Sequence, residues 1–280
     1  MTNRVGKLIR KFRGPTLSES GQEFFTSDIA DLVESDVDIR MLSFIFEGLT
    51  HFLEGGQLPK SQLLQDAFAA GVISRAGSRL SYLEIGGGHP VKHSNTWALD
   101  ASGWVGVVVE PNQDFYTQYS GLRTVDTSVK TRAVVPDAGG LTTMEFVGVG
   151  ELSYISEVGS PPNDAWMGLR RKAVKDGLTS RVPIVSALEL WDETVAQIGI
   201  PSYLSIDIEG LEIPILRKLP LSDARPTVIT VETSEDDKRV VETDEILLSQ
   251  GFVRVLAKAS RWDNWYVDSS AYSKLMGSLR

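Results

Sequence analysis

Five acidic residues stand at or near the ends of short apolar segments in this 280-residue sequence. They are Glu84, Glu110, Asp207, Glu209 and Glu232. If these segments are strands of an open parallel sheet, ligands bind at the edge where the carboxyl ends of the strands meet. The positions of the carboxylates therefore predict an acid-lined ligand site at that edge.

Three consecutive glycines, Gly86-Gly87-Gly88, follow the first of these acids. Glycines let the backbone approach a ligand closely, which suits phosphates or the carboxylate end of an amino-acid-like cofactor. A dinucleotide fingerprint needs a further glycine at position 91, where this sequence has Val91. Glu84 would also repel a pyrophosphate and is better suited to a cation. The missing glycine at position 91 and the nearby Glu84 therefore disfavour an NAD(P)-linked oxidoreductase, which remains an alternative.

Glu110 follows an apolar run that is predicted to be a strand over residues 104–109. From this position a carboxylate can accept hydrogen bonds from two ribose hydroxyls, in NAD and in S-adenosylmethionine alike. The alternative is an acid that only stabilises the helix expected after Pro111.

The segments that position these residues alternate between short apolar runs and helical stretches from about residue 79 onward. Strands are predicted over residues 81–85, 104–109, 181–185, 203–207, 227–231, 252–257 and 264–267. Helices are predicted over residues 91–101, 112–119, 187–198, 213–219 and 236–250. This alternation is typical of an α/β fold with a mainly parallel sheet. Residues 131–135 and 141–147, joined by Asp137-Ala138-Gly139-Gly140, are predicted to form a hairpin.

Two regions lie outside this alternation. Apolar residues at helical spacing over residues 27–53, and again after Pro59, predict a helical N-terminal extension over residues 1–78, ahead of a catalytic domain over residues 79–280. Residues 153–180 contain a Pro/Gly-rich stretch and a basic helix with Arg170 and Arg171. We interpret this region as an insertion or lid, whose arginines would meet an anionic acceptor.

Composition excludes several classes of protein. At 42% hydrophobic and 23% charged residues, the chain is typical of a soluble globular protein and not of a disordered one. The absence of cysteine excludes disulfides, thiolate metal sites and a cysteine nucleophile. No apolar run approaches the roughly 20 residues that span a bilayer, and no signal peptide is recognisable. A cytoplasmic location is expected.

The net charge of −9 argues against a nucleic-acid partner. The charge is uneven, because residues 1–13 hold five basic residues and no acidic one. This segment could make peripheral contact with an acidic membrane surface or partner, or could be a solvated chain end.

Four runs of sequence carry a resemblance to a known family. They are Tyr82-Leu83-Glu84-Ile85-Gly86-Gly87-Gly88, Ser94-Asn95-Thr96, Gly103-Trp104-Val105-Gly106-Val107-Val108-Val109-Glu110-Pro111-Asn112 and Leu204-Ser205-Ile206-Asp207-Ile208-Glu209-Gly210-Leu211-Glu212. In this order they resemble the FkbM family of S-adenosyl-L-methionine-dependent methyltransferases, over roughly residues 79–267. The resemblance implies a class I methyltransferase fold: Rossmann-like, doubly wound, with a mostly parallel seven-stranded sheet whose last strand is antiparallel. It also implies O-methylation of a hydroxyl, often of a sugar in a glycan or glycolipid.

Matched position by position, the resemblance implies how the cofactor is held. Glu84, Gly86 and Gly88 correspond to the loop around the methionine moiety, Glu110 to the ribose ligand and Asp137 to a residue near adenine. His89-Pro90 departs from the small residue that many methyltransferases have there, and the N-terminal extension is not part of the family core.

For the chemistry, Asp207 is expected to be the most important carboxylate. It alternates with Glu209 along the predicted strand, so both could point at the transferred methyl group or its acceptor. Glu209 could instead complement a helix dipole, and His93 or His89 could be the general base. Asp207 and Glu232 could also bind magnesium or manganese, although no residue spacing enforces a metal site.

The acceptor is expected near the start of the last strand. Trp262 could stack on a sugar ring while Asn264 hydrogen-bonds its hydroxyls, with Asn95 as a further contact. Trp262 could equally be a core residue. The remaining alternative is a non-catalytic protein that binds the cofactor or a partner without turnover.

Overall fold

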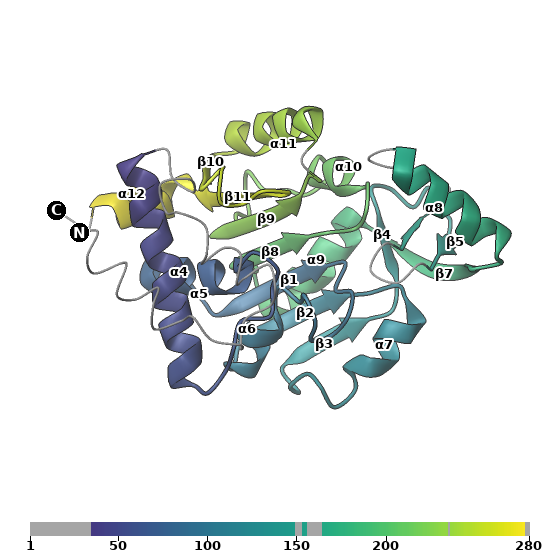
Figure 1. Cartoon of the computed structure of the whole chain (residues 1–280), viewed down its shortest axis with the longest axis horizontal. Helices are drawn as coiled ribbons and strands as arrows, with labels where there is room; N and C mark the ends of the chain where they lie inside the picture. Colours follow the sequence, from purple (N-terminus) through teal and green to yellow (C-terminus); the bar gives the residue numbers. More distant parts are fainter. Residues whose placement is uncertain (1–34, 149–152, 156–163, 235, 278–280) are drawn as a thin grey trace.

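The computed structural model describes residues 35–148, 153–155, 164–234 and 236–277. Its main sheet has seven strands in the order β10-β11-β9-β8-β1-β2-β3 (Figure 1). The strands are β1 (Ser81–Ile85), β2 (Val105–Val109), β3 (Thr127–Lys130), β8 (Tyr203–Ile206), β9 (Val228–Glu232), β10 (Phe252–Val255) and β11 (Asp263–Asp268). Neighbours pair in parallel, except that β11 is antiparallel to β9 and β10. This confirms the predicted mostly parallel sheet with an antiparallel last strand.

Helices cover both faces of the main sheet. They are α4 (Asp36–Glu54), α5 (Gln65–Ala76), α6 (Trp97–Ala101), α7 (Gln113–Tyr119), α9 (Ala187–Ile198), α10 (Glu212–Leu216), α11 (Asp237–Ser249) and α12 (Ser269–Gly277). Because side chains alternate along a strand, Tyr82 and Leu83 belong to two separate hydrophobic clusters. The cluster of Tyr82 contains residues of α4, α5, α6 and α12, and that of Leu83 contains residues of α9, α10 and α11.

The described part of the N-terminal extension packs directly onto the sheet. Phe68 of α5 stacks on Trp265 of β11 with ring centroids 4.8 Å apart. Both side chains are fully buried and lie in the same cluster as Phe44 of α4. The predicted helix after Pro59 is α5, and α4 accounts for the later part of the helical pattern. The basic segment 1–13 lies outside the described residues.

A second sheet of four strands, in the order β4-β7-β5-β6, lies beyond the carboxyl ends of the main strands. Its strands are β4 (Ala133–Val135), β5 (Thr143–Val147), β6 (Tyr154–Ile155) and β7 (Thr179–Ser186), and α8 (Asp164–Lys175) precedes β7. Figure 1 shows this sheet and α8 at the opposite end of the molecule from α4.

The hairpin predicted over 131–135 and 141–147 is wrong. β4 pairs in parallel with the end of β7, and β5 pairs antiparallel with its beginning, so β7 separates the two segments. Turn residues are a local signal, and they cannot reveal a strand that enters from later in the chain. The prediction that 181–185 continues the main alternation is wrong for the same reason, since this strand is β7.

Three further differences concern the elements around the main sheet. The third main strand in chain order is β3 (Thr127–Lys130), which was not predicted because its residues are half-buried and largely polar. The helix predicted over 91–101 is confined to α6, and residues 91–96 form a loop. The last helix, α12, was not predicted. The Pro/Gly-rich part of the predicted lid, residues 156–163, lies outside the described residues.

Within the described residues, no helix combines the length and the apolar character needed to cross a membrane.

Candidate active site

A cavity of about 320 Å³ lies at the carboxyl ends of β1, β2, β8 and β9. β1 is the point where the strand order reverses, because β2 pairs on one side of it and β8 on the other. Loops leaving β1 and β8 therefore diverge, which creates a crevice at this edge. Phe146 of β5 and Ile155 of β6 line the cavity too, so the second sheet contributes an apolar wall.

The glycine loop (residues 86–88) follows β1 and forms part of the cavity floor. Gly86 and Gly87 both donate their N–H to the carbonyl of Val109, at 3.0 and 3.1 Å. Gly86 has a φ of +87°, and a Cβ there would lie 1.7 Å from the carbonyl oxygen of Asp207. Only glycine therefore allows the ends of β1 and β8 to approach this closely.

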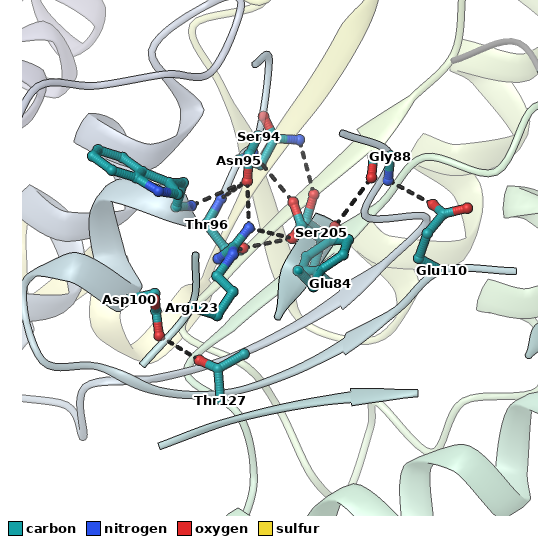
Figure 2. Close-up of polar contacts among 12 residues, drawn as sticks. Glu84, Gly88, Ser94, Asn95, Thr96, Asp100, Glu110, Arg123, Thr127 and Ser205 are labelled. Atoms are coloured by element: carbon teal, nitrogen blue, oxygen red, sulfur yellow. Dashed lines mark hydrogen bonds and ion pairs between the residues drawn. The ribbon is translucent and has the colours of Figure 1, made fainter. Parts of the chain in front are cut away.

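Glu84 is buried at the end of β1, and its carboxylate is held by groups of the protein (Figure 2). It accepts hydrogen bonds from the Asn95 N–H at 3.2 Å and from the Thr96 hydroxyl, and it lies 3.7 Å from the Arg123 guanidinium. Burial raises the pKa of Glu84, while Arg123 and the hydrogen bonds oppose that shift. Its clearest role is to fix the loop of residues 91–96.

Arg123 is a buried cation that the sequence did not reveal. Its guanidinium donates to Ser94 Oγ at 2.8 Å and to Thr96 Oγ1 at 3.0 Å, on the loop that Glu84 holds (Figure 2). Asn95 in turn donates to Ser205 Oγ of β8 at 3.0 Å. The loop is therefore tied to two strands, and Asn95 lines the cavity from this position. A basic residue in a loop carries no sequence signal for such a role.

Glu110 directly follows β2, lines the cavity and contacts the glycine loop. Its two carboxylate oxygens accept from the Gly88 N–H and the Asn112 N–H, each at 2.6 Å. Burial raises its pKa to about 7. Each oxygen keeps a further lone pair for a ligand hydroxyl. The helix that follows, α7, is capped by Asn112, which accepts from the Asp114 N–H, so helix capping does not explain Glu110.

Asp207, Glu209 and Glu232 form an acidic cluster at the ends of β8 and β9. One carboxylate oxygen of each lies within 4.8 Å of those of the other two. Burial first, and the neighbouring carboxylates second, raise the pKa values of Asp207 and Glu232 well above the ordinary range. Carboxylates this close together cannot all be ionised, so the cluster retains a proton or accommodates a cation. Its donor set, three carboxylates, suits magnesium or manganese.

The structure brings Asp207 and Glu209 together, but not by alternation along a strand. β8 ends at Ile206, and Glu209 adopts a left-handed backbone with a φ of +60°. Glu212 holds this turn, because its buried carboxylate accepts from the Ile208 N–H at 3.0 Å and the Gly210 N–H at 3.1 Å. Arg239 of α11 completes the contact as an ion pair with Glu212. Sequence reasoning missed both Glu212 and Arg239 as site-building residues.

The two candidate histidines, His89 and His93, line the cavity. His93 has a left-handed backbone with a φ of +61°, which is uncommon for a residue other than glycine and is frequent at functional sites. His89 accepts the N–H groups of Val91 and Lys92 on its Nδ1, at 3.1 and 3.0 Å. That nitrogen therefore helps to shape the loop of residues 89–92.

Of the predicted acceptor residues, Trp262 and Asn95 line the cavity. Asn264 does not line it: this side chain is fully buried and accepts from Arg254 at 2.9 Å. Arg171 is exposed on α8 and does not line it, and the side chain of Arg170 lies outside the described residues. Asp137, predicted near adenine, is exposed and does not line it either. Because β3 ends at Lys130, residues 132–134 take the place at the cavity that was assigned to Asp137.

Carboxylates dominate the charge of the cavity. Glu84, Glu110 and the acidic cluster all line it. Within the described residues, its lining includes one lysine, Lys92, and one arginine, Arg132. Arg132 is also bound to Glu193 by two hydrogen bonds, which offsets its charge. The cavity therefore favours a cationic ligand over an anionic one.

Comparison with known proteins identifies a family. The sequence model of the methyltransferase FkbM domain matches residues 84–254. The crystal structure of a methyltransferase FkbM from Methylobacillus flagellatus KT aligns with 80% of this chain at 12% sequence identity and a TM-score of 0.38. The chain spans 60% of the length of that structure. No curated protein matches the sequence.

Proposed function

This chain belongs to the methyltransferase FkbM domain family, and from that premise we propose that it is an S-adenosylmethionine-dependent O-methyltransferase acting on a sugar hydroxyl. The observation that carries the proposal is the acid-lined cavity between the glycine loop and the ends of β2, β8 and β9. S-adenosylmethionine carries a sulfonium and an ammonium group, and both suit a cavity whose described lining holds more acidic than basic side chains.

The same cavity argues against a dinucleotide. The pyrophosphate of NAD(P) would meet Glu84 and Glu110, and the basic side chains among the described lining residues are Lys92 and Arg132. Phosphates also favour the N-terminus of a helix, but here residues 89–96 intervene between the glycine loop and α6. The chemistry of these residues therefore fits a sulfonium cofactor better than the oxidoreductase alternative.

The lining residues fit the parts of this cofactor. Glu110 would accept the ribose hydroxyls, and the glycine loop would lie along the methionine moiety. Four of the apolar lining residues, Pro111, Val134, Phe146 and Ile155, would contact the adenine ring. Bound in this way, S-adenosylmethionine supplies an electrophilic methyl group on a sulfur that leaves as a neutral thioether.

The acidic cluster would act on the acceptor. The acceptor oxygen must lose its proton as it bonds to the methyl carbon, and Asp207 is our candidate to accept that proton. Burial and the neighbouring carboxylates raise its pKa, which makes the ionised carboxylate a stronger base. Alternatively, magnesium or manganese held by Asp207, Glu209 and Glu232 would bind and acidify the hydroxyl. His93 is the remaining candidate base.

Calorimetry tests the cofactor assignment. We expect the protein to bind S-adenosylhomocysteine and not NAD⁺ or NADP⁺. Binding of a nicotinamide cofactor without S-adenosylhomocysteine would support an oxidoreductase. Incubation with methyl-labelled S-adenosylmethionine and glycan or glycolipid extracts, followed by mass spectrometry, then tests for the acceptor. S-adenosylhomocysteine binding without label transfer to any hydroxyl would favour the non-catalytic alternative.

A further inference from the structure

One wall of the cavity comes from outside the matched family domain. The connection between α4 and α5 (residues 55–64) precedes the matched residues, which begin at Glu84. Gln62 of this connection lines the cavity and is half-buried. Its side-chain amide makes no hydrogen bond to any other residue that the structure describes. Gln62 therefore presents both a donor and an acceptor to the cavity.

The backbone on the N-terminal side of Gln62 is held firmly. The buried carboxylate of Asp66 accepts from the Lys60 N–H at 2.8 Å and from the Ser61 hydroxyl. Ser61 also forms an isolated parallel bridge with His93, which joins this connection to the loop of residues 91–96. Gln62 is thus fixed next to a residue that is a candidate base.

On its C-terminal side, Gln62 is tied to the last strand. The Gln65 side chain accepts from the Leu63 N–H at 2.8 Å and donates to Asp263. Asp263 directly follows Trp262, which lines the same cavity. The guanidinium of Arg261 lies 5.9 Å from the centre of the Trp262 ring and helps to orient it. One set of contacts therefore positions an amide and an indole at the same cavity.

The charge of the cavity limits the class of acceptor. An anionic acceptor would approach Asp207, Glu209 and Glu232 and be repelled, whereas a neutral one would not. An aromatic face with a neutral amide is well suited to a sugar ring, which offers C–H groups to the ring and hydroxyls to the amide.

We propose that Gln62 and Trp262 form the acceptor-binding wall of the cavity, and that Gln62 selects neutral, polyhydroxylated acceptors by hydrogen bonding a hydroxyl that is not methylated. The proposal rests on the proposed function. The proposal assigns acceptor specificity to the connection of residues 55–64, which lies outside the matched family domain. The choice of acceptor can therefore vary while the cofactor site stays the same.

The test uses the full chain loaded with S-adenosylhomocysteine. The probes are the neutral methyl glycosides of glucose, galactose, mannose and rhamnose, together with methyl glucuronide as the anionic counterpart of the glucoside. Binding is measured by saturation-transfer NMR titration. We expect at least one neutral glycoside to bind, and more tightly than the glucuronide. Gln62→Ala should weaken that binding about 3- to 10-fold, the effect of one hydrogen bond.

Gln57→Ala is the matched control, because Gln57 is a half-buried residue of the same connection that does not line the cavity. It should leave glycoside binding unchanged, and both variants should bind S-adenosylhomocysteine like the wild type. The inference is overturned if Gln62→Ala binds glycosides normally, if the glucuronide binds best, or if no glycoside binds the loaded protein. Failure of the wild type to bind S-adenosylhomocysteine would instead overturn the proposed function.

Discussion

At the scale of single residues, the cavity contains two kinds of carboxylate. Glu84 and Glu110 already accept hydrogen bonds from backbone N–H groups, and these bonds hold the surrounding loops. Asp207 and Glu232 are instead buried beside other carboxylates, and burial first and these neighbours second raise their pKa values. Perturbed carboxylates of this second kind are typical of sites where protons move. We therefore expect substitutions of the two kinds to have different effects.

Glu110 should make cofactor binding depend on pH near neutrality. Its pKa is about 7, and only the ionised carboxylate can accept hydroxyl hydrogen bonds on both oxygens. The affinity for S-adenosylhomocysteine should therefore fall as the pH decreases from 8 to 6. Glu110→Gln should flatten this profile, and Glu110→Ala should weaken binding by up to about 3 kcal/mol. Calorimetry at several pH values measures both, and an unchanged profile in Glu110→Gln would remove the ribose assignment.

Asp207 should matter for turnover and not for cofactor affinity. Asp207→Asn keeps the shape of the side chain but removes its charge, so the turnover number should fall about 10²-fold or more. Binding of S-adenosylhomocysteine should remain close to that of the wild type. Methyl transfer to a confirmed acceptor is the measurement. Normal turnover in Asp207→Asn would show that the residue is structural and would direct attention to His93 and Glu209.

A chelator separates the two proposed routes of proton removal. If the acidic cluster holds a metal, EDTA should abolish wild-type turnover, and magnesium or manganese should restore it. Activity that is indifferent to EDTA would favour direct base catalysis by Asp207 or His93.

At the scale of elements, the site depends on how two loops leave the sheet. The end of β1 contacts the turn after β8, since the Asp207 N–H donates to the Ile85 carbonyl at 2.9 Å. Glu212 and Arg239 hold the second of these loops from α10 and α11. Neither loop is rigid by its own sequence, so their geometry comes from these contacts.

The glycine loop offers a matched pair of substitutions. A Cβ at Gly86 would lie 1.7 Å from a backbone oxygen, whereas a Cβ at Gly88 would meet nothing within 4 Å. Both residues have positive φ, so both alanine variants carry the cost of that conformation, about 1 kcal/mol. Gly86→Ala should in addition force β1 and β8 apart and abolish S-adenosylhomocysteine binding. Equal stability and binding in the two variants would contradict this account of the crevice.

Glu212 should affect turnover indirectly, by positioning the turn that carries Glu209. Glu212→Gln removes the charge that pairs with Arg239 and weakens the hold on the turn that carries Glu209, so the turnover number should fall about 10-fold at nearly constant cofactor affinity. Glu242→Gln is the control, because the Arg217–Glu242 ion pair is exposed and contributes less than about 1 kcal/mol. Kinetics and thermal unfolding of both variants check this prediction. Identical kinetics for the two variants would show that Glu212 has no positioning role.

At the scale of the whole molecule, the described part of the N-terminal extension belongs to the same packed structure as the sheet. Phe68 of α5 and Trp265 of β11 are both fully buried in a single hydrophobic cluster. The same extension carries Gln62 to the cavity. Packing of the core and the lining of the cavity are therefore linked through this region.

Phe68→Ala should lower the free energy of unfolding of the N-terminal extension and the main sheet together. Loss of a buried phenylalanine costs about 3–5 kcal/mol, and a shared core should unfold in a single transition. Differential scanning calorimetry should show one transition at reduced temperature. A separate early transition for the extension, with the remainder unchanged, would indicate that it folds as an independent unit.

Much of the fold could be predicted because its signals are local. Apolar runs bounded by turn residues identified six of the seven main strands, and helical periodicity identified α5, α9 and α11. The strand-end carboxylates Glu84, Glu110, Asp207 and Glu232 could also be predicted to meet, since parallel strands end at one edge. β3 was missed because its residues are half-buried and mostly polar, so it lacks the apolar signal.

The sequence by itself therefore determined the α/β class with a mainly parallel sheet and the acidic edge, because the periodicity of side chains and the alternation of strands and helices can be read from short segments. Only the tertiary structure decided which groups meet across long separations. Gln65 and Asp263, for example, are 198 residues apart in sequence. Such contacts decide that Gln62 lines the cavity and that Asp137 and Asn264 do not. These long-range contacts form only when packing of the whole chain brings distant backbone segments together, which no local pattern of residues encodes.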